Sequence, residues 1–186
     1  MANTNVFTGS NGTLTLADEN TPEGQDAKKV VDLYEIRTVG RVIGVEIAIQ
    51  TDLTEYHEIG RRHATSLHAG DIHISGKISR AYINGALLFL LMGRGASPSN
   101  IAEPYVQPTF NMKVSLTDPA GPGTTAGIEL KGVKFQNWSY ALPEQDFVME
   151  DVSFKALAIR VLDEQAPAGG GQPVAQAPEF SDTATA

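Results

Sequence analysis

Two long stretches of this chain alternate between apolar and polar side chains, and this alternation constrains the fold more than any other feature. In the first stretch, DIHISGKISRAYI (residues 71–83), the side chains on one face are Ile72, Ile74, Ile78 and Tyr82. The side chains on the other face are His73, Ser75, Lys77 and Ser79. Because successive side chains of a β-strand point to opposite faces, the stretch is predicted to be a strand with one face on a core and one in water.

The second stretch, RVIGVEIAIQTDL (residues 41–53), has the same period. Its apolar face is predicted to pack on the core and consists of Ile43, Val45, Ile47, Ile49 and Leu53. Its other face is small or polar and consists of Gly44, Glu46, Ala48, Gln50 and Asp52. Two long strands with such a wet face are hard to explain in a monomer, and they suit a protein whose sheets are completed by its neighbours.

The remaining segments bring the predicted total to roughly seven strands and one helix. Residues 5–16 and 30–37 are expected to be strands, residues 108–119 and 127–142 a hairpin, and residues 147–162 one long last strand. The run NGALLFLLMGRG is predicted to be a short buried helix that begins after Asn84 and ends at Gly93. The predicted fold class is therefore mainly β, an antiparallel β-sandwich or barrel with one short flanking helix.

The length of 186 residues, with 41% hydrophobic and 19% charged residues, fits one globular domain. We expect this domain to span residues 1–163, with long polar loops at residues 17–29 and 54–70. Residues 164–186 form a tail rich in alanine, proline and glycine, which has too few large apolar side chains to build a core of its own.

Charge and cysteine content exclude several classes of protein. A formal net charge of −8 argues against a protein that binds nucleic acid tightly, since such binding depends on lysine and arginine. The absence of cysteine excludes disulfides and thiolate zinc sites. With no secretory signal and no apolar run near the roughly 20 residues that span a membrane, the chain is expected to be made in the cytoplasm and not to enter a membrane.

No constellation of residues indicates an enzyme, a metal site or a cofactor. The histidines His57, His63, His68 and His73 are five or six residues apart, a spacing that does not match a metal site. Glu46 and Asp52 are not set apart as a catalytic pair from the many other acids. We expect Trp138 to lie in the core or an interface rather than to stack on a ligand. The pair Arg61 and Arg62 is expected in a subunit contact or an exposed loop rather than an anion site.

The middle of the chain also carries a family pattern. The segment EIGRRHATSLHAGDIHISGKISRAYI combines an arginine-containing loop that ends in glycine with a strand that contains serine and glycine, and its marker residues are Gly60, Arg61 or Arg62, His68, Gly70, Ser75 and Gly76. Downstream, FNMKVSLTDP and ELKGVKFQNWSYALPEQDFVMEDVSFKALAI look like a hairpin followed by a last strand. Over residues 34–162 the chain resembles the tail tube proteins of contractile bacteriophages and related phage-like particles. The proline-rich insertion at residues 97–108 and the tail depart from that family.

The resemblance implies hexameric rings, stacked into a hollow tube, in which hairpins of each copy complete an inter-subunit β-barrel. The wet face would then line the bore through which DNA passes, and the lumen-facing candidates are Glu46, Gln50, Asp52, His73, Ser75, Lys77, Ser79 and Lys113. Candidates for contacts between subunits or rings are Arg61, Arg62, His68, Asp18 and Glu19.

The implied partners are further copies of the chain, the sheath, baseplate and tail-terminator proteins, and, transiently in the lumen, the tape-measure protein and DNA. The protein would lie in the virion tail after synthesis in the cytoplasm of a bacterial host. Two alternatives stay open. The chain could be the tube subunit of a contractile injection particle that carries no DNA, or a monomeric β-sandwich module that binds a sugar or peptide through Trp138 or Tyr105.

Overall fold

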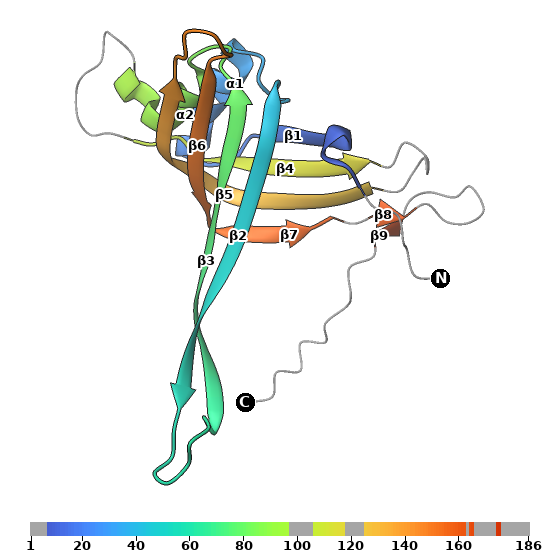
Figure 1. The fold of residues 1–186 in the computed structure, drawn as a ribbon. Coiled ribbons are helices and arrows are strands. Elements are labelled where there is room, and N and C mark those ends of the chain that lie inside the picture. Colours follow the sequence, from blue (N-terminus) through green and yellow to red (C-terminus); the bar gives the residue numbers. More distant parts are fainter. Residues whose placement is uncertain (1–6, 97–105, 118–124, 163, 166–173, 176–186) are drawn as a thin grey trace.

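One antiparallel sheet organises the chain and curls into a half-barrel around the core (Figure 1). The computed structural model describes residues 7–96, 106–117, 125–162, 164–165 and 174–175. The strands are β1 (Gly12–Ala17), β2 (Val42–Tyr56), β3 (Ser66–Ala81), β4 (Phe110–Thr117), β5 (Thr125–Ala141), β6 (Met149–Ala156) and β7 (Ala158–Val161). Their order is β1-β4-β5-β6-β3-β2, with β7 beside β5. This arrangement confirms the predicted mainly β, antiparallel fold class.

Strand β5 belongs to both halves of the curled sheet. Its first half pairs with β4 and β7, and its second half pairs with β6. Gly132 lies between the two halves with φ +62, and the register with β6 shifts between Phe135 and Asn137. A left-handed glycine and a bulge are the usual means of bending a strand, and Figure 1 shows β5 curving at this place.

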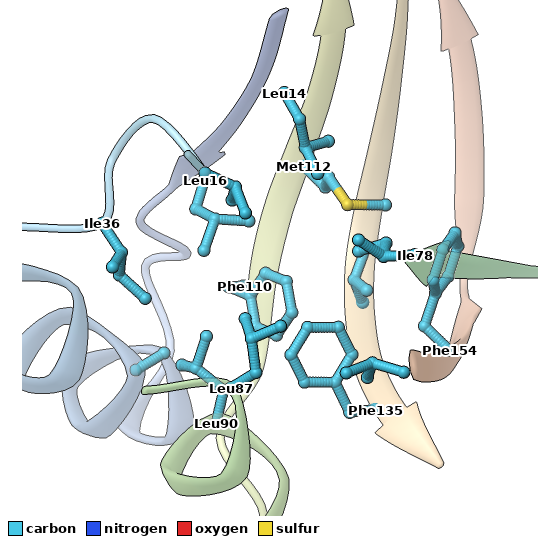
Figure 2. Packing of buried hydrophobic residues seen from close by; sticks show 14 of the residues in the cluster. Leu14, Leu16, Ile36, Ile78, Leu87, Leu90, Phe110, Met112, Phe135 and Phe154 are labelled. Carbon is cyan, nitrogen blue, oxygen red and sulfur yellow. The ribbon is translucent and has the colours of Figure 1, made fainter. Parts of the chain in front are cut away.

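The core fills the concave side of the half-barrel. The rings of Phe110 and Phe135 meet edge to face with centroids 4.9 Å apart. Figure 2 shows them between side chains of the sheet, such as Ile78, and those of the helices, such as Leu87 and Leu90. Burial of so many large apolar side chains is the main stabilising contribution in a domain of this size.

The predictions of a loop at residues 17–29 and of a strand at residues 30–37 are wrong, because Pro22–Leu33 form the helix α1, which was not predicted. The start of α1 has ordinary helix signals, because Thr21 Oγ1 accepts a hydrogen bond from the Gly24 N–H at 3.0 Å and proline follows Thr21. Glycine has a low helix propensity, but Gly24 lies where a β-carbon would be 2.0 Å from the Glu19 carbonyl oxygen, so the close approach requires glycine.

The predicted buried helix is confirmed as α2 (Ala86–Met92). Asn84 Oδ1 accepts a hydrogen bond from the Ala86 N–H at 3.2 Å, and Gly93 ends the helix with φ +55. The two helices lie together on one flank of the sheet, where the rings of Tyr34 and Phe89 have centroids 5.9 Å apart. Short 3-10 helices occur at Gly9–Asn11 and Gly93–Ala96.

Two further predictions are wrong. The expected loop at residues 54–70 is too long, because β2 continues to Tyr56 and β3 begins at Ser66, which leaves a tip of residues 57–65. The expected single last strand is divided at Leu157 into β6 and β7. There the Leu157 N–H donates to the Lys131 carbonyl oxygen at 2.9 Å, so the chain leaves β6 and joins the other half of the sheet.

Much of the proline-rich insertion and of the C-terminal tail lies outside the described residues. Within the tail, the two-residue strands β8 (Glu164–Gln165) and β9 (Val174–Ala175) pair with each other, and Glu164 pairs with Thr125 of β5. None of the helices in the described ranges is long and apolar enough to cross a membrane.

Candidate assembly surface

One face of the sheet formed by β2, β3, β6 and the second half of β5 is polar. In antiparallel strands, residues directly opposite each other share a face. The register places Glu46 opposite Lys77, Ala48 opposite Ser75, and Gln50 opposite His73. The structure therefore brings together six of the predicted lumen-facing residues, namely Glu46, Gln50, His73, Ser75, Lys77 and Ser79. We call this surface the polar face.

The other two strands extend the polar face with residues that sequence reasoning missed. From β6 it gains Asp151, Ser153 and Lys155, which lie opposite Ser79, Lys77 and Ser75. From β5 it gains Asn137 and Ser139. For β6 the signal was present in the sequence, because Asp151, Ser153 and Lys155 alternate with Val152 and Phe154 along the last predicted strand.

Charges on the polar face largely neutralise one another. Ser79 Oγ donates to Asp151 Oδ1 at 2.5 Å, and Lys77 Nζ lies 3.2 Å from the same oxygen. The hydrogen bond from Ser79 lowers the pKa of Asp151, with help from Lys77 and against a smaller opposing effect of burial. His73 Nε2 lies 3.3 Å from Asp52 Oδ2. A surface of this kind has no cluster of unpaired cations to bind a polyanion.

The remaining two lumen-facing candidates lie differently. Asp52 is at a bulge, where the pairing of β2 with β3 shifts between Thr51 and Leu53, and it reaches the polar face through its contact with His73. Lys113 lies on β4, between Thr15 of β1 and Glu129 of β5. The structure does not bring Lys113 to the polar face.

The opposite face of β3 is core at one end and exposed at the other. Along this one face Ile78 is 1% exposed, Ile74 is 7% exposed and Ile72 is 64% exposed. Burial stops there because Ile74 lies opposite Ala156, the last residue of β6, and the β2–β3 hairpin continues beyond the body (Figure 1). The expectation that Ile43, Ile49 and Leu53 are core residues is wrong, because all three are exposed.

A buried ion pair joins β3 to β6 at the other end of the sheet. The Arg80 guanidinium donates through Nε to Glu150 Oε1, and both side chains are almost completely buried. Trp138 Nε1 donates to the second Glu150 oxygen at 2.8 Å, and its ring packs on Tyr140. Sequence reasoning missed this network, although Arg80 occupies an apolar-face position of its strand. Trp138 packs against the core, as expected.

The four-stranded part of the sheet has two open edges. Within the described ranges, β2 pairs only with β3, so the outer backbone groups of β2 have no strand partner. The second half of β5 pairs with β6 on one side, and on its other side the Phe135 carbonyl accepts from the Gln107 side chain. Edges with unpaired N–H and C=O groups are sites where another chain can add.

The predicted contact residues lie in two regions. Arg61 and Arg62 are in the exposed tip of the β2–β3 hairpin, and His68 is on the adjoining part of β3. Asp18, which pairs with Lys28 at 3.4 Å, and half-buried Glu19 lie on the segment that leads into α1. Figure 1 shows α1 and the hairpin tip at opposite ends of the molecule.

The pockets lined by the described residues do not bring together a recognisable set of catalytic side chains. A groove of about 490 Å³ between β1, β2 and β4 is lined by glycine, threonine and aliphatic residues, with Arg41 as its charged member. A notch of about 550 Å³ lies where β6 ends. In the described part of the chain, no three His, Asp or Glu side chains are placed to hold a metal ion.

Comparison with solved structures shows where this fold occurs. Neither a protein-family model nor a curated protein sequence matches the chain. The structure is similar, at TM-score 0.56 and 12% identity, to a chain of the sheath–tube complex of PVC, an extracellular contractile injection system, covering 85% of this chain and 92% of that one. It is also similar to a chain of the tube-terminating cap of the anti-feeding prophage, at TM-score 0.58, 12% identity and coverages of 88% and 95%. It is similar as well to the SPP1 tail tube, at TM-score 0.52 and 7% identity, covering 84% of this chain and 78% of that one. The chain thus has the fold of tube proteins from phage tails and contractile injection systems.

Proposed function

We propose that this chain is the structural subunit of a tail tube. Copies join edge to edge into a ring, rings stack into a hollow tube, and the polar face lines the bore. The observation that carries the proposal is a four-stranded sheet with two open edges and one polar, charge-balanced face. The fold shared with the SPP1 tail tube and with the injection-system chains supports it.

The topology suits closure into a ring. Neighbouring strands in the order β2, β3, β6, β5 are all antiparallel, so β2 and the second half of β5 run in opposite directions. If β2 of one copy pairs with β5 of the next, the antiparallel pattern continues across the joint without a break. The edge backbone groups along the paired length then find partners, which is how a closed barrel removes its edges. The number of six copies per ring comes from the family resemblance.

The polar face suits a bore through which a charged polymer slides. Each phosphate neutralised by lysine or arginine adds affinity, so a channel for DNA must not present unpaired cations in quantity. On this face Lys77 is paired with Asp151, and Lys134, at its edge, is paired with Glu23 at 2.7 Å, which leaves Lys155 as the lysine of this face with no ion pair among the described residues. The same lining would serve a tube that carries a protein cargo. The expected partners, named from the neighbouring complexes, are a sheath, a baseplate and a tube-terminating cap.

The test uses the absence of cysteine from the natural sequence. A Ser75→Cys variant, labelled after assembly with a small gold–maleimide, is expected to show density inside the bore in electron micrographs. A Lys131→Cys variant carries the label on the opposite half of the sheet and is expected to show density in the wall or outside it. Purified protein that stays monomeric at high concentration, or gold outside the tube for Ser75→Cys, would contradict the proposal.

A further inference from the structure

The two ends of strand β6 carry features that complement each other. Before β6, the turn of residues 142–148 (LPEQDFV) is exposed, and its Leu142 and Phe147 side chains are 75% and 81% exposed. After β6, the chain bends away at Leu157 while β3 continues, and this leaves the notch of about 550 Å³. Figure 1 shows the β5–β6 turn at the top of the sheet and the end of β6 at its lower border.

The notch is apolar with a cationic rim. Its walls include the aliphatic side chains of Ile72, Ile74 and Leu157, of which Ile72 and Leu157 are largely exposed. Lys155 also lines it, and the described residues offer Lys155 no ion pair. The other lysine at the notch, Lys134, is already paired with Glu23. An exposed apolar hollow beside a free ammonium group matches a ligand that combines an apolar side chain with a carboxylate.

The turn has that combination of groups. Phe147 stands next to Asp146, and Glu144 precedes them; neither acid has an ion-pair partner among the residues that the structure describes. The turn is held in place from below, because the Tyr82 N–H donates to the Val148 carbonyl oxygen at 2.8 Å and the Tyr82 ring stacks on Tyr140. A phenylalanine presented on an anchored turn binds with little loss of conformational freedom.

We propose that the β5–β6 turn of one copy docks into the notch of a second copy in the adjacent ring. Phe147 enters the hollow between Ile72 and Leu157, and Glu144 or Asp146 pairs with Lys155. The two surfaces lie at opposite ends of the same strand, so copies that meet end to end, with the projecting β2–β3 hairpin beside the next copy, bring the turn of one copy to the notch of the other. A contact between two different patches of identical molecules repeats without limit, which is what a stack of rings requires.

Local charge supports a second copy as the occupant. An acidic turn against an unpaired lysine places opposite charges at the point of contact, and this offsets part of the repulsion between copies of formal charge −8. The proposal rests on the proposed function, because it assumes that rings of this chain stack.

Cross-linking tests the contact directly. In a Phe147→Cys, Leu157→Cys double variant, a bis-maleimide with a reach of about 8 Å is expected to join copies of different rings and to give a ladder on denaturing gels. Each single-cysteine variant, and a Phe147→Cys, Leu33→Cys variant whose second site is an equally exposed leucine on α1, is expected to give no such ladder. Tubes that form normally but yield no ladder from the Phe147–Leu157 pair would overturn the contact.

Substitutions that invert the charges of the proposed ion pair provide a second test. A Lys155→Glu variant is expected to form rings but to need about tenfold more protein to form tubes, since it places like charges together. Adding Glu144→Lys and Asp146→Lys is expected to restore assembly. Failure of the triple variant to recover, with folding verified by circular dichroism, would contradict the pairing. If the unmodified chain forms no rings at all, the proposed function is wrong. If rings and tubes form equally well with and without these substitutions, only the proposed contact is wrong.

Discussion

At the scale of single residues, the Arg80–Glu150 pair places two charged groups in the core. Two charges removed from water stabilise a fold only when each satisfies the other, and the Trp138 N–H bond to Glu150 completes the set of partners. The pair joins β3 to β6 near the Tyr82–Tyr140 stack, because Glu150 lies opposite both Arg80 and Tyr140 in the sheet. We infer that it fixes the register of these two strands at the end that carries the β5–β6 turn.

Breaking one side of this pair should therefore destabilise the subunit strongly. Glu150→Gln leaves the Arg80 charge buried without a counter-charge, and we expect it to lower the free energy of unfolding by about 3–5 kcal/mol. The double variant Arg80→Met, Glu150→Leu is expected to cost less than Glu150→Gln alone, since it removes both charges. Urea unfolding of the dissociated subunit measures both values. A double variant that is the less stable of the two would show that the pair contributes net stability.

A second residue-scale prediction concerns pH and the carboxylate of Asp26, on α1. Burial raises its pKa, but hydrogen bonds and charge from Arg94 and Lys29 outweigh burial, so the pKa lies below its ordinary value. A carboxyl whose folded pKa is depressed contributes stability above its unfolded pKa of about 3.9, and this contribution is lost as pH falls through the folded value.

Asp26→Asn should thus cost about 1–2 kcal/mol at pH 6, and the cost should shrink below about pH 4. Asp32→Asn provides the control on the same helix, because Asp32 is half exposed and its pair with Arg37 lies on the surface. We expect that variant to change stability by less than about 0.5 kcal/mol at either pH. Thermal unfolding between pH 3 and 7 provides the comparison, and a cost for Asp26→Asn that is constant over this range would refute the assignment.

At the scale of elements, the β2–β3 hairpin explains both what the sequence predicted well and what it did not. Alternation predicted the two faces of β2 and β3 correctly, because the period of a strand is fixed by its backbone. Alternation could not tell which part of an apolar face is covered, since that depends on where β6 ends. The exposed isoleucines of the projecting half therefore looked identical to the buried ones.

Local sequence patterns were also insufficient to predict helix α1 and the division of the last strand. Thr21 caps helix α1 and Pro22 is its first residue, which are ordinary signals of a helix start, yet the polar composition of residues 17–29 predicted a loop. The division of the last predicted strand at Leu157 has no local signal, because Lys131 of β5, far away in the sequence, accepts the hydrogen bond that redirects the chain. The hairpin of β4 with β5 and the helix α2 were predicted because their determinants are local.

Two isoleucines on one face of β3 test this description of the hairpin. Ile78→Ser is expected to lower the free energy of unfolding by about 3 kcal/mol or more, since Ile78 is fully enclosed and its removal leaves a cavity. Ile72→Ser, six residues earlier on the same face, is expected to change it by less than about 0.5 kcal/mol in the dissociated subunit. Equal costs would mean that the projecting half folds back onto the body in solution.

At the scale of the whole molecule, the open edges and the projecting hairpin have no further strand partner within the described part of the chain. The tip carries Arg61 and Arg62, both exposed. In a stacked tube the neighbouring ring is expected to cover this tip, so an arginine-specific protease should cleave there quickly in rings and at least about tenfold more slowly in tubes. Rings of the Lys155→Glu variant provide the unstacked reference. Identical rates in both assemblies would show that the tip stays uncovered.

The position of the turn and the notch at opposite ends of β6 has one more consequence. A column built through this contact is directional, and its two termini are chemically unlike: one displays empty hollows, the other bare phenylalanines. A protein that stops growth at the first terminus must therefore imitate the aromatic turn, while one that starts growth at the second must offer a hollow. One protein cannot bind both termini through this contact, so the start and the end of the column require different capping proteins.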